Sequence, residues 1–407
     1  MTTFEFGAFL RSDLPPAAAR WSGFPPFNFV GGHNDAGCVP VDELIACAAD
    51  ALRSEGRSLC TYGMDSGPLG HRGLREFIAA KLGRDAGIRC TADEVLITSG
   101  SLQGLDLVNE VLVGAGDTVI MEEMTYGGAI TRLKRRGARI VGVPVDEDGL
   151  RADALEAALS SLAASGVRPK YVYTIPTVQN PTATVMSEAR RREILALAAR
   201  FDVPVFEDEC YADLTWSGAR PPAMRALDAD GRVVHIGSFS KTIAPALRLG
   251  YLVADWPLMS RILGVKSDGG SGALEQMVLA RFCREYFDSN LARLRGVLEG
   301  KARALAASLH RHFGDTVRFV DPPGGIFLWM RAAEPVDTTR LFDIASRAGI
   351  ALNPGAEWMT DAEAGRRWMR LCFAHPSPEV MEAGVARLGE VCRREFGVPA
   401  VPASAHR

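Results

Sequence analysis

The 407-residue sequence contains no pair of cysteines with C-x-x-C spacing. Its eight cysteines are scattered instead, at positions 38, 47, 60, 90, 210, 283, 372 and 392. Zinc sites and the disulfide frameworks of small secreted domains use closely spaced cysteines, so neither a metal site nor a disulfide framework is expected. Scattered reduced thiols favour a cytoplasmic protein.

Long apolar runs and a strong charge of one sign are also absent. No stretch of about 18 apolar residues occurs, so no membrane span is expected. The first residues, MTTFEFGAFLR, lack a basic region followed by an apolar core and do not resemble a secretory signal. A formal net charge of -3 leaves no basic footprint for nucleic acid. Neither a membrane nor a nucleic-acid partner is therefore expected.

What is present is the composition of a globular protein, with 47% hydrophobic and 23% charged residues. The length exceeds that of one compact core, which favours two domains. Segments with strand-like and helix-like apolar spacing alternate, and Arg190 and Arg191 are expected on the solvent side of their helix. Strands are expected at 94–98, 118–121, 140–143, 171–175, 203–207 and 233–236, with helices at 102–113, 126–136, 150–162 and 187–201. This rhythm predicts an α/β fold with a mostly parallel, doubly wound sheet, which binds ligands beyond the carboxyl ends of its strands.

Small polar residues follow two of these strands. After strand 94–98 comes the turn Ser99-Gly100-Ser101-Leu102 at the start of a helix. Free backbone N–H groups at such a helix start can bind a phosphate, although an ordinary cap formed by Ser101 has the same sequence pattern. After strand 233–236 comes a turn that presents hydroxyl groups, an amine and a guanidinium, from Ser238, Ser240, Lys241 and Arg248. A lysine can form a Schiff base with an aldehyde, and arginine suits bidentate contact with a phosphate.

An acidic cluster, Glu207-Asp208-Glu209, ends the strand at 203–207. A buried carboxylate needs a cationic partner, which a structural salt bridge or a protonated ligand can supply. The residues alone leave open which of the three acids has a ligand as its partner. Tyr126 and Asn180 also follow strands, where core packing and a plain turn are the competing interpretations.

Together these segments resemble the fold-type I pyridoxal-phosphate enzymes, in particular the class I and II aminotransferases of the aspartate and 2-aminoadipate aminotransferase type. The resemblance covers nearly the whole chain, from about residue 31 to residue 396. It implies the PLP-dependent transferase fold of type I, with a doubly wound large domain and a smaller α/β domain. The expected division is an N-terminal arm with part of the small domain at 1–45, the large domain at 46–290 and the rest of the small domain at 291–407.

The resemblance also implies roles for individual residues. Lys241 forms the Schiff base with pyridoxal 5′-phosphate, Asp208 pairs with the ring nitrogen, and Tyr211 and Asn180 bind the phenolic oxygen. Tyr126 stacks on the ring, and Arg370, in R-L-C-F, clamps the substrate carboxylate in preference to Arg366 and Arg367. The sequence departs from the family at Ala183, where a glycine is usual, and at His33 and Asn34. The phosphate is assigned to Ser99, Gly100, Ser101, Leu102, Ser238, Ser240 and Arg248, with Tyr62 of the neighbouring subunit of a homodimer, and the substrate to Gly32, Asn180 and Arg370.

The function implied is transfer of an amino group from an L-amino acid to a 2-oxo acid through Lys241. The same site residues serve β-elimination, racemisation and oxygen-dependent oxidation, which stay open as alternatives within the fold. A DNA-regulatory protein with an aminotransferase-like sensor is a hypothesis of another class, as is a non-catalytic scaffold. The glycine-rich loop at 266–272 fits either a phosphate contact or a hinge.

Overall fold

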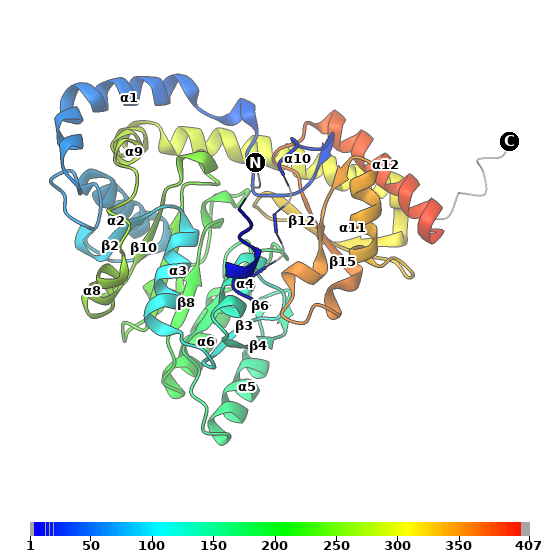
Figure 1. Ribbon diagram of the computed structural model, residues 1–407, viewed down its shortest axis with the longest axis horizontal. Helices are drawn as coiled ribbons and strands as arrows, with labels where there is room; N and C mark the ends of the chain where they lie inside the picture. The colour runs from blue at the N-terminus through cyan, green and yellow to red at the C-terminus, as the bar shows by residue number, and fades with distance from the viewer. Residues whose placement is uncertain (1–3, 13, 16, 19, 400–407) are drawn as a thin grey trace.

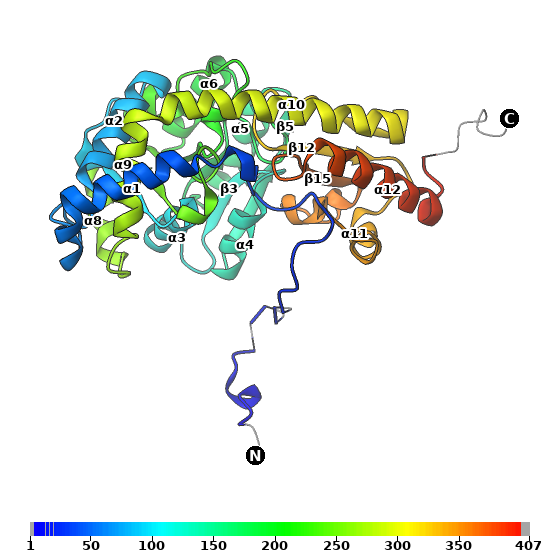
Figure 2. The same ribbon diagram turned by 90° about the horizontal axis from the view of Figure 1, so that it is seen from above.

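The structure is a computed structural model that describes residues 4–12, 14–15, 17–18 and 20–399. It has a larger part built on a seven-stranded sheet and a smaller part built on a four-stranded sheet. The long helix α10 (Phe287–Phe313) runs from one part to the other (Figure 1), and the described residues before position 27 project away from the body (Figure 2). Among the described residues, α10 included, no helix is long and apolar enough to cross a membrane.

The seven-stranded sheet has the order β2-β10-β9-β8-β7-β3-β4. Strand β10 is antiparallel to both of its neighbours, and the other pairs are parallel. The carboxyl ends of β9, β8, β7 and β3 therefore meet at one edge, which is where a doubly wound sheet binds its ligand. The strands are β2 (Val95–Thr98), β3 (Thr118–Glu122), β4 (Arg139–Val143), β7 (Val172–Thr174), β8 (Val205–Asp208), β9 (Val233–Ser238) and β10 (Gly250–Val253).

Alternate residues of these strands pack on opposite faces of the sheet. Tyr173 and Phe206 belong to the apolar cluster shared with α3, α4 and α8. Val172 and Val205 belong to the cluster shared with α5 and α6 on the other face. The helices of the larger part are α1 (Val41–Glu55), α2 (Arg72–Ala86), α3 (Ser101–Leu112), α4 (Gly127–Arg135), α5 (Ala152–Ala164), α6 (Glu188–Arg200), α7 (Met224–Leu227), α8 (Trp256–Val265) and α9 (Ala273–Glu285).

The smaller part joins the N-terminal stretch to the C-terminal one. Its antiparallel sheet has the order β11-β12-β15-β14. Strand β1 (Phe27–Asn28) pairs in parallel with β13 (Ile350–Ala351), which brings the residues near position 30 next to this sheet. The other elements are β11 (Val317–Phe319), β12 (Phe327–Ala332), α11 (Thr338–Arg347), β14 (Asn353–Pro354), β15 (Trp368–Cys372) and α12 (Pro378–Phe396).

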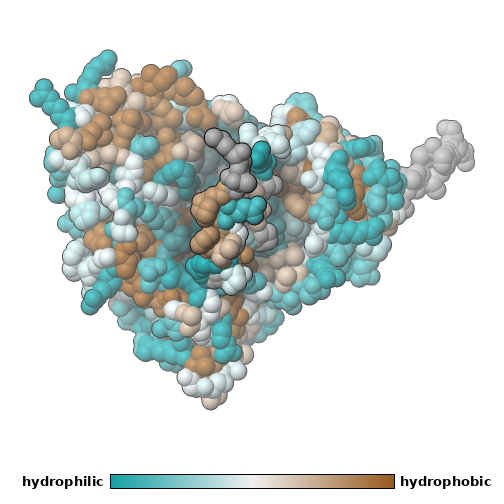
Figure 3. Space-filling view, in the orientation of Figure 1, coloured by the Kyte–Doolittle hydropathy of each residue, from teal (hydrophilic) through white to brown (hydrophobic). Residues whose placement is uncertain are grey.

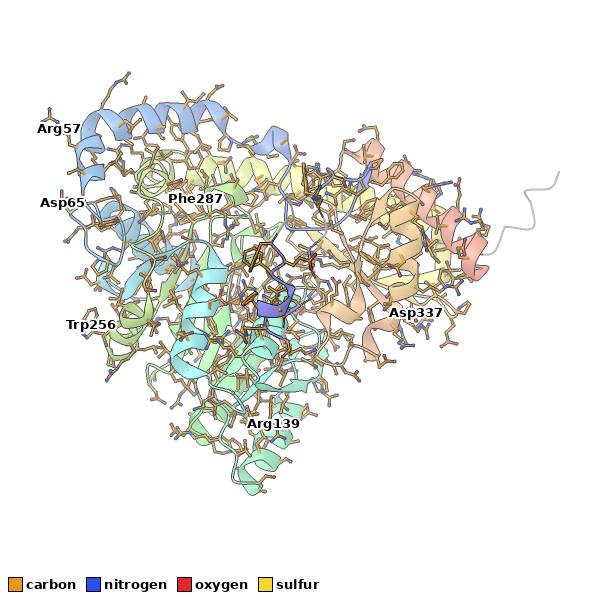
Figure 4. All side chains as sticks on the ribbon, viewed as in Figure 1. Arg57, Asp65, Arg139, Trp256, Phe287 and Asp337 are labelled. Atoms are coloured by element: carbon orange, nitrogen blue, oxygen red, sulfur yellow. The ribbon has the colours of Figure 1, made fainter. Side chains whose placement is uncertain are left out.

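Helix α9 ends at Glu285 and α10 begins at Phe287, which stands at their junction. Its ring is buried and lies 5.4 Å from the ring of Phe77. Figure 4 places Phe287 in the interior, whereas Arg57, Asp65 and Trp256 lie at the periphery. The start of α10 is thus fixed in the core of the larger part, and its other end packs on α12 of the smaller one.

Two local expectations were wrong. Gly149–Leu150 form strand β6, paired with β5 (Val145–Asp146), where the sequence predicts the start of a helix. Arg191 is fully buried instead of solvent-facing. Its guanidinium lies within ion-pair distance of the buried Glu209 and donates to carbonyl and hydroxyl oxygens, so its charge is compensated inside the protein. Ser187 caps α6 by accepting from the backbone N–H of Arg190.

Candidate active site

A cavity of about 300 Å³ lies at the carboxyl edge of the seven-stranded sheet. Segments from both parts of the molecule line it, including the N-terminal stretch at Gly31 and Gly32 and strand β15. Nearly all the site residues expected from the sequence meet here. Those that line the cavity are Gly32, Ser101, Leu102, Tyr126, Asn180, Asp208, Tyr211, Ser238, Ser240, Lys241, Arg248 and Arg370.

Lys241 presents its amine to the middle of this cavity. The Nζ atom donates a hydrogen bond of 2.8 Å to the carbonyl oxygen of Gly32. A Cβ at Gly32 would lie 2.1 Å from Nζ, so glycine leaves the space that the amine uses. Burial lowers the pKa of the Lys241 amine, which favours the neutral, nucleophilic form.

Asp208 ends β8 beneath the cavity, and its carboxylate is buried. Tyr173 donates its hydroxyl to Oδ2 at 2.7 Å, and the backbone N–H of Cys210 donates to Oδ1 at 3.2 Å. No cation among the described residues forms an ion pair with it. Burial raises the pKa of Asp208, against which these two hydrogen bonds act. A cationic ligand would supply the missing partner.

The two neighbouring acids are engaged elsewhere. Glu207 lies 2.9 Å from Nδ1 of His235 and accepts from the backbone N–H of Met224. Glu209 is within ion-pair distance of Arg191 and Arg220. Neither acid lines the cavity.

The start of α3 forms the wall of the cavity nearest Arg248. Gly100 is the N-cap, with φ of 75°, and Ser101 is the first helical residue, so the cap is Gly100 and not Ser101. The Arg248 guanidinium donates to the carbonyl oxygen of Ser99 at 3.2 Å, and a Cβ at Gly100 would lie 2.3 Å from one of its nitrogens. Ser99 and Gly100 therefore adjoin the site through Arg248 and do not themselves line the cavity. The unpaired N–H groups of the first helical turn lie beside an arginine, an arrangement suited to an anion.

Asn180 and Tyr211 are joined at the cavity by a hydrogen bond of 3.4 Å from the amide of Asn180 to the tyrosine oxygen. The peptide bond between Asn180 and Pro181 is cis. Ala183, which stands where the family has glycine, adopts φ of 63° in the left-handed region. Tyr126 precedes α4 and faces the same cavity.

Arg370 is a buried cation whose hydrogen-bond partners are neutral groups. Its guanidinium donates to Oδ1 of Asn180, to the carbonyl of Gly31 and to Oδ1 of Asn353, at 3.1, 3.1 and 3.0 Å. Its charged carbon lies 3.7 Å from the ring centroid of Trp358, and its Nε atom is buried without a hydrogen-bond partner. No carboxylate of the described residues pairs with it, and burial lowers its pKa. A buried guanidinium in these surroundings favours the binding of an anion.

The sequence interpretation missed Asn353 and Trp358, which also line the cavity. The rival arginines lie elsewhere: Arg366 binds Glu363, and Arg367 binds Glu334 and the carbonyl of Ala332. No local sequence signal marks Asn353 or Trp358, because β14 and the turn after it reach Arg370 only through sheet pairing.

Tyr62 does not reach this cavity within one chain. It is 94% exposed and lines a second cavity of about 790 Å³ together with Gly269 and Gly270 of the glycine-rich loop. The loop is tied to the phosphate-side turn through Gln103, which accepts from the N–H of Ser99 and donates to Asp268. Hydrogen bonds of Gln103, in the first turn of α3, therefore connect the walls of the two cavities.

The residues present fit pyridoxal 5′-phosphate. The cofactor has an aldehyde, a phosphate and a basic ring nitrogen, and the cavity offers a buried amine at Lys241, an anion-binding helix start beside Arg248, and a buried carboxylate at Asp208. The carboxylate has no cationic partner among the described residues, so the donor set contains a place for a protonated ring nitrogen.

Comparison with known proteins agrees with this chemistry. A family model for aminotransferase class I and II matches residues 35–388. The 2-aminoadipate transaminase of Thermus thermophilus is 32% identical over 90% of this chain and 90% of that protein. The HTH-type transcriptional regulator TauR of Rhodobacter capsulatus is 30% identical over 90% of this chain and 74% of that protein.

Among solved structures, LysN, an alpha-aminoadipate aminotransferase from Thermus thermophilus complexed with N-(5′-phosphopyridoxyl)-L-leucine, has a TM-score of 0.83 and 33% identity, with 90% of this chain and 92% of that chain covered. The family match and the relatives that are named aminotransferases support an aminotransferase over the lyase, racemase and oxidase alternatives. The chain belongs to the class I and II aminotransferases, a fold-type I enzyme of the transaminase type whose cofactor is pyridoxal 5′-phosphate.

Proposed function

We propose that Lys241, Asp208 and Arg370 carry the transfer of an amino group from an L-amino acid to a 2-oxo acid. The observation that supports this most is their convergence on one cavity, where none of the three has an ion-pair partner among the described residues and where Asp208 and Arg370 are buried. A buried charge without a partner is costly. The cost is offset if a ring nitrogen, a carbonyl and a carboxylate occupy the cavity together.

The cofactor would be held at four points. Ser101, Ser238, Ser240 and Arg248 would bind its phosphate, with the backbone of Ser99, Gly100 and Leu102. Asp208 would hold the ring nitrogen, Tyr211 and Asn180 the phenolic oxygen, and Tyr126 one ring face. When bound, pyridoxal phosphate supplies an electron sink for the bonds at the substrate Cα.

The chain's own residues supply the binding and the proton transfer. Arg370 would bind the substrate carboxylate through its guanidinium, and Asn180 and Gly32 would line its position. The Nζ atom of Lys241 would remove the proton from the substrate Cα and deliver it to C4′ of the cofactor, because a neutral amine near the reacting atoms can act as both base and acid. The depressed pKa of Lys241 favours this neutral form.

A two-step assay tests this function. Amino donors would first be mixed with the cofactor-loaded enzyme alone, starting with 2-aminoadipate, for which a relative is named. We expect a productive donor to convert the cofactor to its amine form, and 2-oxoglutarate or pyruvate to reverse the change. Release of ammonia, inversion at Cα or consumption of oxygen without the amine form would contradict the proposal and favour elimination, racemisation or oxidation.

We also propose that the protein is a homodimer in which Tyr62 reaches the cofactor phosphate of the neighbouring subunit. The support is an apolar surface formed by α1 and α9, which we call the α1–α9 face. Ile45 is 62% exposed and Val41 55% exposed on it, and Figure 3 shows apolar side chains gathered over α1. A shallow groove of about 320 Å³ is lined there by Val41, Leu44, Ile45, Ala48, Leu247, Leu274, Glu275 and Val278. A contiguous apolar patch with an exposed tyrosine nearby is typical of an interface between subunits.

Replacing Ile45 by aspartate tests the dimer. A charge in the middle of the α1–α9 face should prevent association, so light scattering should give about 43.8 kDa in place of twice that mass. Val320→Asp is the matched control, because Val320 is 79% exposed in the smaller part, away from this face. An unchanged mass for Ile45→Asp, or an equal loss in the control, would argue against the interface.

We keep the division of the chain at residues 46 and 290 as a proposal, supported by the pairing of β1 with β13 across the sequence. A cytoplasmic location is likewise proposed. Its support is that all eight cysteines are free, including the exposed Cys60.

A further inference from the structure

The hydroxyl of the buried Tyr173 has one hydrogen-bond partner among the described residues, the carboxylate of Asp208. Its hydroxyl donates to Oδ2 at 2.7 Å. It lies on β7, directly opposite Phe206 in the register of β7 with β8, and its ring meets the Phe206 ring edge-on at 5.8 Å. The residue does not line the cavity, and no role was assigned to it from the sequence.

We propose that Tyr173 is a positioning residue that holds Asp208 ionised and correctly oriented to bind the cofactor ring nitrogen. This inference rests on the proposed role of Asp208. Tyr173 would act only through that carboxylate, since its side chain does not face the cavity.

Tyr173 donates a hydrogen bond to Asp208 without carrying a charge of its own. Asp208 has to be ionised to bind a protonated nitrogen, yet burial disfavours the ionised form. An arginine or lysine at the position of Tyr173 would stabilise the carboxylate but would also neutralise it, which would remove its attraction for a cationic ring. A tyrosine hydroxyl stabilises the anion by a hydrogen bond and leaves its charge for the ligand.

The hydroxyl keeps its proton over the working range of pH. Burial, followed by the neighbouring Asp208, raises the pKa of Tyr173 well above its ordinary value. The other titratable groups near Asp208 are Cys210 and Tyr211 on its own segment, His235 on β9 and Tyr126 before α4. Burial raises the pKa of Tyr211. Burial also raises the pKa of Cys210 and Tyr126, so both are uncharged at neutral pH. Tyr173 is therefore a constant donor to Oδ2.

Replacing Tyr173 by phenylalanine removes this donor and keeps the ring. A hydrogen bond to a charged group contributes more free energy than one between neutral groups. We therefore expect loss of this bond to raise the dissociation constant of pyridoxal phosphate from the apoprotein about 10- to 100-fold. The remaining carboxylate would be more basic, so the pH titration of the bound cofactor's absorbance and the acid limb of kcat should both move to higher pH. A role limited to packing would change neither the titration nor the acid limb, and that result would overturn the inference.

Tyr171 provides a matched control. Its ring also meets Phe206 edge-on, at 5.7 Å, and its buried hydroxyl donates at 2.6 Å to a side chain, Oδ1 of Asn109. We expect Tyr171→Phe to leave cofactor affinity and the pH titration unchanged, whatever it does to thermal stability. Equal loss of cofactor affinity in the two variants would show a general packing effect and overturn the inference.

The variant Asp208→Asn separates this inference from the proposed function. In the Asp208→Asn background, Tyr173→Phe should have no further effect on cofactor affinity, because the group it acts through is gone. A full additional loss in that background would overturn the role of Tyr173 alone. Unchanged affinity on Asp208→Asn by itself would overturn both the role of Asp208 and the inference built on it. Melting of each apoprotein checks that the variants are folded.

Discussion

Replacing Lys241 by alanine is expected to reduce turnover by about 10⁴-fold or more, because the variant loses both the nucleophile and the general acid–base. Lys241 lines the cavity, and the one hydrogen-bond partner of its amine among the described residues is the carbonyl of Gly32. The visible absorbance of lysine-bound cofactor should disappear with the activity. Steady-state kinetics and absorption spectra of the loaded protein measure both effects.

Two further variants separate the chemistry of the amine from its charge. Lys241→Arg keeps a cation but cannot serve as the nucleophile, so it should be as inactive as the alanine variant. Lys134→Ala removes an exposed lysine from α4 and should leave the activity unchanged.

The Lys241→Ala variant should fold at least as stably as the wild-type apoprotein, because burial disfavours the charged amine. Added small primary amines should restore part of the proton transfer. Full activity of Lys241→Ala, with its absorbance retained, would refute the assignment.

The edge of the sheet that holds the site could be predicted from local sequence patterns. Strand periodicity and the small residues after each strand are properties of short segments, so Ser101, Lys241 and Asn180 were placed correctly at strand ends. The choice among Glu207, Asp208 and Glu209 also has a local basis. Alternation along β8 puts Asp208 on the face of Phe206, toward α3, and the two glutamates on the opposite face. The sequence shows this separation but not which face borders the cavity.

The sequence prediction put Arg191 on the solvent side because arginine is charged, and it did not use the position of Arg191 in the helical period. It lies three residues before Ile194 and seven before Ala198, on the same buried stripe of α6. The helical period therefore indicated burial, and the compensating carboxylate, Glu209, comes from a distant strand that no local pattern identifies.

Contacts between distant segments were the part that the sequence could not supply. Tyr173 and Asp208 meet through strand pairing, and Trp358 reaches Arg370 from the turn after β14. The expected contact of Tyr62 with the cofactor likewise depends on a distant segment, in this case one supplied by a second chain.

Replacing Arg370 by lysine is expected to have the second largest effect. Truncating one partner of a buried, hydrogen-bonded charge pair costs about 2–5 kcal/mol, so kcat/KM for an amino acid should fall roughly 30- to 5,000-fold. Lysine keeps the charge but cannot make the planar two-point contact. It also cannot replace the stack on Trp358, which now lies 3.7 Å from the guanidinium carbon. Both KM and kcat should change, because the clamp binds the substrate and also orients its Cα–H bond.

The substrate carboxylate itself provides the sharpest control for this prediction. For an amine that lacks the carboxylate, wild type and Arg370→Lys should react at similar rates, so the preference for the amino acid over its decarboxylated analogue should collapse in the variant. A dicarboxylate or 2-oxo acid inhibitor should raise the melting temperature of the wild-type enzyme but not that of Arg370→Lys. Arg367→Lys is the matched variant, since Arg367 binds Glu334 and Ala332 outside the cavity, and it should retain wild-type selectivity. If Arg370→Lys kept that selectivity and Arg367→Lys lost it, the clamp would belong to the other arginine.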